Sequence, residues 1–275
     1  MAARLSARLR PIRRGIFLYF RLLSQEVKSI LAYRADFVVL LISAALVQLV
    51  GFAFIWTIFQ KIPDINGWTF WQVVMMYALI FVTEGFASFF FEGTWGLSFL
   101  VYSGDFDQVL LRPVSPVVQV LASRVGFNGI GNIATGGTLM AISLTNAQVD
   151  WTPGRIVIVA VLVASAAVIR VSLNLGAAAI SFWIKSPSTS MVPMFVHQLG
   201  ELAKYPITIY WIGVQGLIVL AIPFAFVSFF PAAFIFDVRS YSALGLLTPI
   251  VAVYCLWVAV TLFQAGLRQY ESTGN

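Results

Sequence analysis

Charged and hydroxyl side chains inside long apolar stretches are the first candidates for chemistry in this sequence. Glu84, Ser88 and Glu92 recur at intervals of four residues, so a helix would place them along one stripe. Arg124 and Arg170 lie in two further apolar stretches. An ionised group in lipid is costly unless it is paired or hydrated, so each residue predicts either an ion pair or a polar pathway.

The expected depths of these residues in a membrane indicate how they would pair. Glu84 and Arg170 are expected near the middle of their spans, and Glu92 and Arg124 nearer the inner ends. We therefore predict the pairs Glu84–Arg170 and Glu92–Arg124, which would neutralise the buried charges. Two interpretations remain open. The pairs hold the helices together, or Glu84 or Glu92 faces a translocation path and selects cationic substrates.

Further polar residues lie in two weaker patterns. The stretch GFNGIGNIATGG, residues 126–137, is rich in small residues, which lets helices approach closely, and Asn128 and Asn132 could bond across such a contact. It could serve packing inside one subunit or a seam between two. A lone histidine beside a carboxylate, here His197 near Glu201, could respond to pH or be held by a neighbouring hydrogen bond.

The residues needed for several kinds of enzyme are missing from the sequence. One histidine, His197, and one cysteine, Cys255, cannot supply a zinc-ligand cluster. Lys185 is followed by Ser186, but residues 179–184 contain no glycine, so the phosphate-binding loop of an ATPase is absent. We predict a protein that is not an enzyme and that binds no metal or cofactor, with any ATP hydrolysed on another subunit.

The composition is that of an integral membrane protein. Of the 275 residues 60% are hydrophobic and 10% are charged, and the mean hydropathy is +0.91. Several apolar segments reach the ~20 residues that a helix needs to cross a bilayer. Backbone groups in lipid must be satisfied within the chain, and the pattern is not the short alternation of a barrel, so helices are expected.

We predict an all-α polytopic fold with six spans between residues 36 and 268. A segment with three prolines, 206–237, comes before the last span, and proline disrupts a straight helix. We expect a re-entrant helical hairpin there, with a full extra span as the alternative. The six spans are expected at residues 37–59, 69–102, 117–144, 156–183, 191–205 and 246–267.

The two ends of the chain indicate its orientation. Residues 1–34 contain eight basic residues and one glutamate, and apolar residues recur between them at helical spacing. This pattern is typical of an amphipathic helix on an anionic membrane surface, rather than of nucleic-acid binding. Positive charge favours the cytoplasmic side, so we expect the basic segment 1–35 and the short tail 269–275 in the cytoplasm.

The stretch SGDFDQVLLRPVSP, residues 103–116, connects two predicted spans on the cytoplasmic side. Ser103 is a suitable N-cap, and aspartates in the first turn favour the helix dipole. We expect a short helix over about 103–113, with Phe106, Val109 and Leu110 on one face and Pro113 at its end. Such a helix cannot bury its apolar face alone, so it must pack on its own membrane domain or in a groove of a partner.

The sequence GDFDQVLLRPVSP resembles the signature loop of permease subunits of type-2 (ABC-2 type) ABC exporters. The usual leucine is Phe106 here, a change that keeps the apolar character. Five other stretches are similar to the family in the same order, and the resemblance runs from about Arg21 to Leu267. They are LAYRADF, INGWTFWQVVMMY, SFWIKSP, KYPITIY and IPFAFVSFFPA.

The resemblance implies one half of an exporter in the cell's cytoplasmic membrane. Segment 103–113 would be the coupling helix that fits a separate ATPase subunit carrying ATP and Mg, and the N-terminal helix would be an interfacial elbow. A second permease, the same chain or more commonly a different one, would complete the pathway. An ion- or proton-coupled transporter without an ATPase is the alternative. The implied coupling residues are Gly104, Asp105, Phe106, Asp107, Leu110, Leu111, Arg112 and Pro113.

Overall fold

The computed structural model describes most of the chain, in several ranges. They are residues 17, 19–21, 24–25, 28, 34–146, 149, 151–184, 186, 190–238 and 240–271. Within them the chain is helical apart from short connections, and it forms no strand beyond one isolated bridge between Ile65 and Trp68. Most of the predicted elbow helix at 1–35, and residues 272–275 of the predicted tail, lie outside the described residues.

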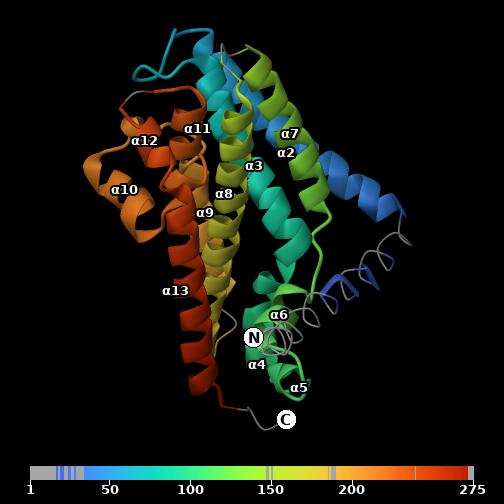
Figure 1. The fold of residues 1–275 in the computed structure, drawn as a ribbon. Coiled ribbons are helices and arrows are strands. Elements are labelled where there is room, and N and C mark those ends of the chain that lie inside the picture. Colours follow the sequence, from blue (N-terminus) through green and yellow to red (C-terminus); the bar gives the residue numbers. More distant parts are fainter. Residues whose placement is uncertain are drawn as a thin grey trace.

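Long helices run along the molecule, and short helices gather at its two ends (Figure 1). The long ones are α2 (Arg34–Phe59), α3 (Phe70–Phe91), α7 (Asn128–Asn146), α8 (Pro153–Ala179), α9 (Met191–Leu202) and α13 (Thr248–Gln269). At the lower end lie α4 (Leu97–Ser103), α5 (Phe106–Leu110) and α6 (Pro116–Leu121). In the upper half lie α10 (Ile212–Gly216), α11 (Phe229–Ile235) and α12 (Ser242–Gly245).

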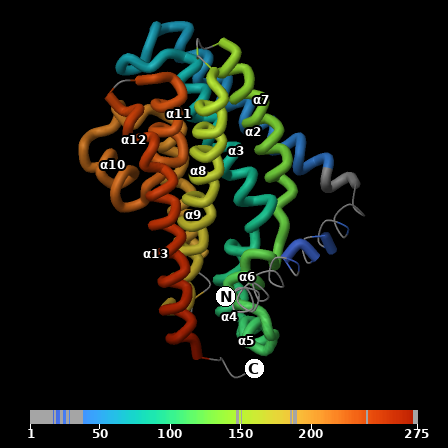
Figure 2. Tube along the Cα trace, in the orientation of Figure 1, coloured from blue at the N-terminus to red at the C-terminus, as the bar shows by residue number. Residues whose placement is uncertain are grey.

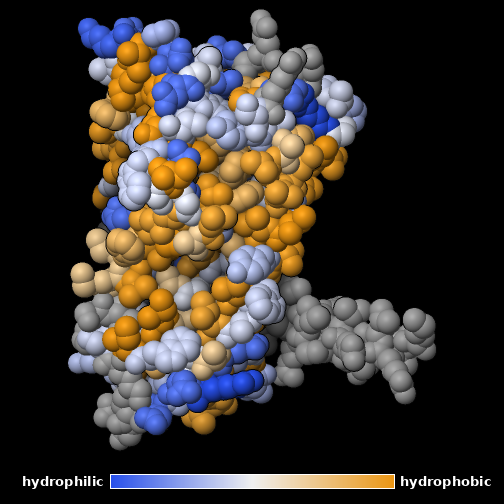
Figure 3. Space-filling model, turned by 90° about the vertical axis from the view of Figure 1, so that its left-hand side faces the viewer, coloured by the Kyte–Doolittle hydropathy of each residue, from blue (hydrophilic) through white to orange (hydrophobic). Residues whose placement is uncertain are grey.

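Two helix groups form the body. Helix α8 packs along α13, and α7 packs against both α3 and α2 (Figures 1 and 2). The core includes α3, whose residues Val73 to Ile80 are all buried. Helices α2 and α13 are apolar but largely exposed, which suits contact with lipid. The space-filling view shows the result, an apolar belt between polar ends (Figure 3).

Four described helical stretches are long and apolar enough to cross a membrane, which makes the protein a multi-pass membrane protein. They are Val38–Phe59, Phe70–Ser103, Pro153–Phe182 and Ser242–Gln269. Two short helical stretches, Ile212–Ala221 and Phe224–Ile235, are bent by 72° and would make a fifth if taken as one span. The predicted third and fifth spans fall short, because α7 is rich in polar residues and α9 has only 12 residues.

Two of the predicted spans are interrupted in the structure. The second continues past α3 through a 3₁₀ turn, η1 (Glu92–Gly96), before α4 begins. The predicted continuous third span is wrong, because a non-helical link, residues 122–127, separates α6 from α7. Glycine contacts explain both breaks: a Cβ on Gly93 would lie 1.9 Å from the Val120 carbonyl oxygen, and the Gly126 N–H donates to the Ser88 carbonyl at 3.0 Å.

The small-residue stretch 126–137 packs inside the subunit. A Cβ on Gly131 would lie 2.9 Å from the side chain of Ala44 on α2. The Gln48 amide donates to Asn132 Oδ1 at 2.8 Å, and the Thr135 hydroxyl also bonds to Gln48. The predicted bonding of Asn132 across a helix contact is therefore confirmed, and α2 is its partner.

The crossing of α3 and α7 depends on glycine at Gly129. A Cβ there would lie 2.5 Å from the Gly85 carbonyl oxygen and 2.6 Å from the Phe89 backbone nitrogen. Gly129→Ala is expected to destabilise the protein by about 1–3 kcal/mol, because backbone must move to make room. Thermal unfolding in detergent measures the loss. Gly137→Ala on the same helix is the control, since nothing lies within 4 Å of its Cβ, and equal melting temperatures would contradict the expectation.

Candidate functional site

The segment between the second and third predicted spans forms a compact unit at the lower end of the molecule. Helix α4 ends at Ser103, and Gly104 follows with φ of 82°, a left-handed conformation that suits glycine. The predicted N-cap role of Ser103 is therefore wrong, since α5 begins at Phe106, after Asp105. The Ser103 hydroxyl instead donates to the Asp105 carboxylate at 2.8 Å, which closes the turn between the two helices.

One side of α5 is anchored on the ends of two long membrane helices. Phe106 is buried, and its ring lies 5.1 Å from the rings of both Phe182 and Tyr270. Phe182 in turn lies 5.1 Å from Phe263 of α13. The Tyr270 hydroxyl donates to Asp107 Oδ1 at 2.9 Å. Helix α5 is thus attached to the ends of α8 and α13, in addition to its own flanking helices.

The other side of the segment is open. Leu111 is 85% exposed, and Leu110, Arg112 and Pro113 are exposed as well. Leu110, expected on one face with Phe106 and Val109, is 43% exposed, whereas Phe106 is buried, so Leu110 does not share the buried face. The run from Leu110 to Pro113 therefore presents two leucines and one arginine at the tip of the molecule.

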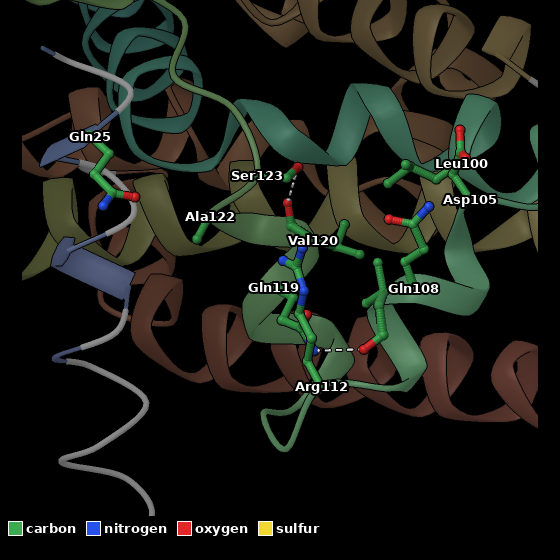
Figure 4. A pocket seen from close by; sticks show the side chains of 10 residues that line it. Gln25, Leu100, Asp105, Gln108, Arg112, Gln119, Val120, Ala122 and Ser123 are labelled. Carbon is green, nitrogen blue, oxygen red and sulfur yellow. Dashed lines mark hydrogen bonds between the residues drawn. The ribbon is translucent and has the colours of Figure 1, made fainter. Parts of the chain in front are cut away.

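A pocket of about 410 Å³ adjoins this tip, between α4, α5 and α6. In Figure 4 the side chains of Gln108 and Arg112, from the α5 region, face Gln119 and Ser123, from the α6 region. The Gln119 amide donates to the carbonyls of Val109 at 2.9 Å and Val114 at 2.8 Å. These two hydrogen bonds fix the backbone on either side of the exposed residues Leu110 to Pro113.

A second group of charged residues lies in the middle of the helix bundle. Glu84 of α3 and Arg170 of α8 form the predicted ion pair, and the Arg170 side chain is only 1% exposed. His197 of α9 places Nδ1 2.8 Å from Arg170 Nη2 and 3.6 Å from Glu84 Oε1. His197, which the sequence singles out for its neighbour Glu201, therefore contacts the Glu84–Arg170 pair. The expected depths in the membrane did not indicate this contact.

The second predicted pair does not form among the described ion pairs. Glu92 receives a hydrogen bond of 2.7 Å from Ser88, whose hydroxyl also lies 3.0 Å from the Asn128 side chain. Arg124 is exposed and lies in the non-helical link 122–127, not within a span. The prediction assumed a continuous third helix, and the break in that helix removes the basis for equal depth.

Comparison with known proteins identifies the chain. Residues 45–274, which include the segment at the tip and the central charged group, match the family described as ABC-2 family transporter protein. The chain belongs to the ABC-2 transporter family. No curated protein and no solved structure matches it.

Membership of the ABC-2 family agrees with the sequence composition and with the helical fold. The family consists of membrane transport components, in keeping with the multi-pass helices and the missing phosphate-binding loop. Partnership within an ABC transporter is implied in general by the family. The match covers the described protein from the middle of α2 onward.

Tyr270 is a residue of this ABC-2 protein that the sequence did not single out. It is separated from Asp107 by 163 positions, so no local pattern could reveal the contact. Burial, followed by the hydrogen bond to Asp107, raises the pKa of Tyr270 to about 12. The phenol therefore stays protonated and able to donate at every physiological pH. Its contribution to stability is complete below about pH 10, the ordinary value, and is lost as the pH rises toward 12.

Removing the Tyr270 hydroxyl should loosen α5 without unfolding the protein. Tyr270→Phe is expected to cost about 0.5–1.5 kcal/mol at most, because the ring contacts with Phe106 and Phe182 remain. Thermal unfolding in detergent measures the loss. Tyr254→Phe, in the exposed part of α13, is the control. Equal melting temperatures for the two variants would contradict the expected link between α5 and α13.

Proposed function

We propose that this ABC-2 protein is the permease subunit of an ATP-driven exporter. It would form half of the translocation pathway and receive movement from a separate ATPase subunit through the segment 103–113. The observation that carries the proposal is the two-sided character of the segment 103–113: Phe106 is buried among aromatic rings, while Leu111, just after α5, is 85% exposed.

This arrangement suits the transfer of movement. A short helix in a partner's groove is recognised through exposed apolar and charged anchors, here Leu110, Leu111 and Arg112. Its opposite side must be rigidly attached if displacement is to reach the membrane. The bonds from Gln119 and Tyr270, together with the rings around Phe106, supply that attachment.

We place the protein in the cytoplasmic membrane, with both termini on the cytoplasmic side. The dense positive charge of residues 1–34 supports that side for the N-terminus. The stretch 206–237 would be a re-entrant hairpin at the outer side, because its helices are bent by 72° and lie in the upper half (Figure 1). Arg155 ties its end to α8 through the Ile235 carbonyl at 3.0 Å and Asp237 at 3.5 Å.

The proposed assembly contains two permease chains and two ATPase subunits. ATP and Mg would bind the ATPase subunits, because this sequence lacks a phosphate-binding loop. The second permease would be a related, different chain or a second copy, and lipid would cover the exposed apolar sides of the spans. Nucleic acid is not a proposed partner.

Affinity purification of the tagged full-length chain in mild detergent tests this function. We expect an ATP-binding subunit to accompany it, with ATPase activity that the reversal Arg112→Glu uncouples from transport. Leu244→Met, in α12 in the upper half of the molecule, is the control variant, and it should purify with the same subunits and activity as the unchanged protein. A chain that purifies without any ATPase and moves substrate under a pH gradient would overturn the proposal in favour of an ion-coupled transporter.

A further inference from the structure

The central charged group borders a cavity within the membrane domain. The cavity has a volume of about 420 Å³ and lies between α2, α3, α7, α8 and α9. One part of its wall is apolar, from Leu40, Val47, Ile80 and Phe81. The polar part consists of Glu84, Asn128, Asn132, Arg170, His197, Gln198, Glu201 and Lys204.

The two cations of this wall are already covered. Arg170 is 1% exposed, pairs with Glu84 and lies 5.1 Å from the centre of the Phe224 ring. Its Nε and Nη1 have no hydrogen-bond partner among the described residues, but both atoms are enclosed by protein. Lys204 is 11% exposed, pairs with Glu201 and lies 4.4 Å from the centre of the Phe81 ring. Arg170 is therefore enclosed, and Lys204 is held by Glu201 and Phe81.

Glu201 is the most accessible charge of the wall, whereas Glu84 is 14% exposed. Glu201 is 42% exposed and uses Oε2 for Lys204, so its other oxygen is open to a ligand. Glu84 uses Oε2 for Arg170 and keeps Oε1 near His197, at 3.6 Å. His197 accepts from Arg170 at Nδ1 when it is neutral, so it adds no positive charge in that state. The wall thus offers acceptors beside an apolar surface.

We propose that this cavity binds an amphiphilic organic cation, with the positive group against Glu201 and Glu84 and the apolar body against Ile80, Phe81 and Val47. The inference rests on the proposed permease function, because it names the class of substrate that the pathway would carry. The open oxygen of Glu201 and the Glu84 carboxylate attract positive charge, and Ile80, Phe81 and Val47 provide apolar contact beside them.

Direct binding of two hydrophobic ions of the same shape and opposite charge tests the inference. The full-length protein, with any subunits that accompany it, is placed in lipid nanodiscs, and tetraphenylphosphonium and tetraphenylborate are titrated without nucleotide. Empty nanodiscs correct for partition into lipid. We expect saturable binding of tetraphenylphosphonium alone. Because neither ATP nor hydrolysis is needed, a failure of ATPase coupling would leave this result intact and is thus distinguishable from a failure of the site.

Variants locate the binding in the cavity. Glu201→Gln is expected to weaken tetraphenylphosphonium binding by about tenfold, because one attraction between opposite charges at a partly exposed site is lost. Glu92→Gln is the matched control, because Glu92 begins η1 and is not part of the cavity wall. Nanodisc samples of both variants are compared by melting temperature, so that misfolding is excluded. Saturable tetraphenylborate binding, absence of saturable binding, or unchanged affinity in Glu201→Gln would each overturn the inference.

Discussion

On the proposed function, replacement of Leu111 by aspartate is expected to release the ATPase subunit from this protein. Leu111 is the most exposed large apolar residue at the tip, at 85%. If Leu111 is a hot spot of the interface, its loss costs about 2 kcal/mol or more, which should weaken association by roughly 30-fold. Co-purification at falling protein concentration, with the bound ATPase quantified, measures the change.

The membrane domain itself should tolerate this replacement. Leu111 lies after the end of α5, and the anchoring contacts of Phe106 and Gln119 do not involve it. Leu111→Met keeps the apolar character and is the matched control, for which we expect near-normal association. If Leu111→Asp retained the ATPase as well as Leu111→Met does, the exposed run would not be the docking surface.

Removal of the Glu84 carboxylate is expected to produce the largest loss of stability of any single change considered. Glu84→Ala would leave Arg170, buried at 1% exposure, without its counter-charge. Breaking a buried pair by removing one partner typically costs about 3–5 kcal/mol, because the remaining charge stays desolvated. The melting temperature in detergent, together with the fraction of monodisperse protein, reports the loss.

A double replacement separates the pair from general packing. Glu84→Leu combined with Arg170→Met removes both charges while keeping similar volumes, and it should recover most of the stability lost in Glu84→Ala. His197 then loses both charged neighbours, 2.8 Å and 3.6 Å away. A double variant that is no more stable than Glu84→Ala would show that the helices depend on the ions themselves rather than on neutrality.

Long apolar runs in the sequence, and the expected depths of charged residues in the membrane, predict three of the long helices and one ion pair. The segments around α2, α8 and α13 follow from long apolar runs with polar or proline-containing ends. The contact between Glu84 and Arg170 follows from equal depth on two uninterrupted helices. The position of the tip segment was also predicted, although α5 covers only Phe106–Leu110.

The remaining features depend on contacts that no local pattern contains. The breaks after α3 and before α7 arise where Gly93 and Gly126 let backbone approach backbone, so they could not be read from hydropathy. Arg124 was misplaced because its link was taken for helix. Tyr270 follows the last span like an ordinary polar end, and only the tertiary structure brings its hydroxyl to Asp107.

The polarity of α7 has a consequence for how the chain enters the membrane during synthesis. Helix α7 is not among the described stretches apolar enough to span, and its Asn132 and Thr135 reach Gln48 of α2. A nascent α7 would therefore partition poorly into lipid by itself. It must enter after α2 and α3 are available to receive its amide and hydroxyl groups. Helices α2 and α3 precede α7 in the sequence, so both are translated before α7 and are available when it enters the membrane.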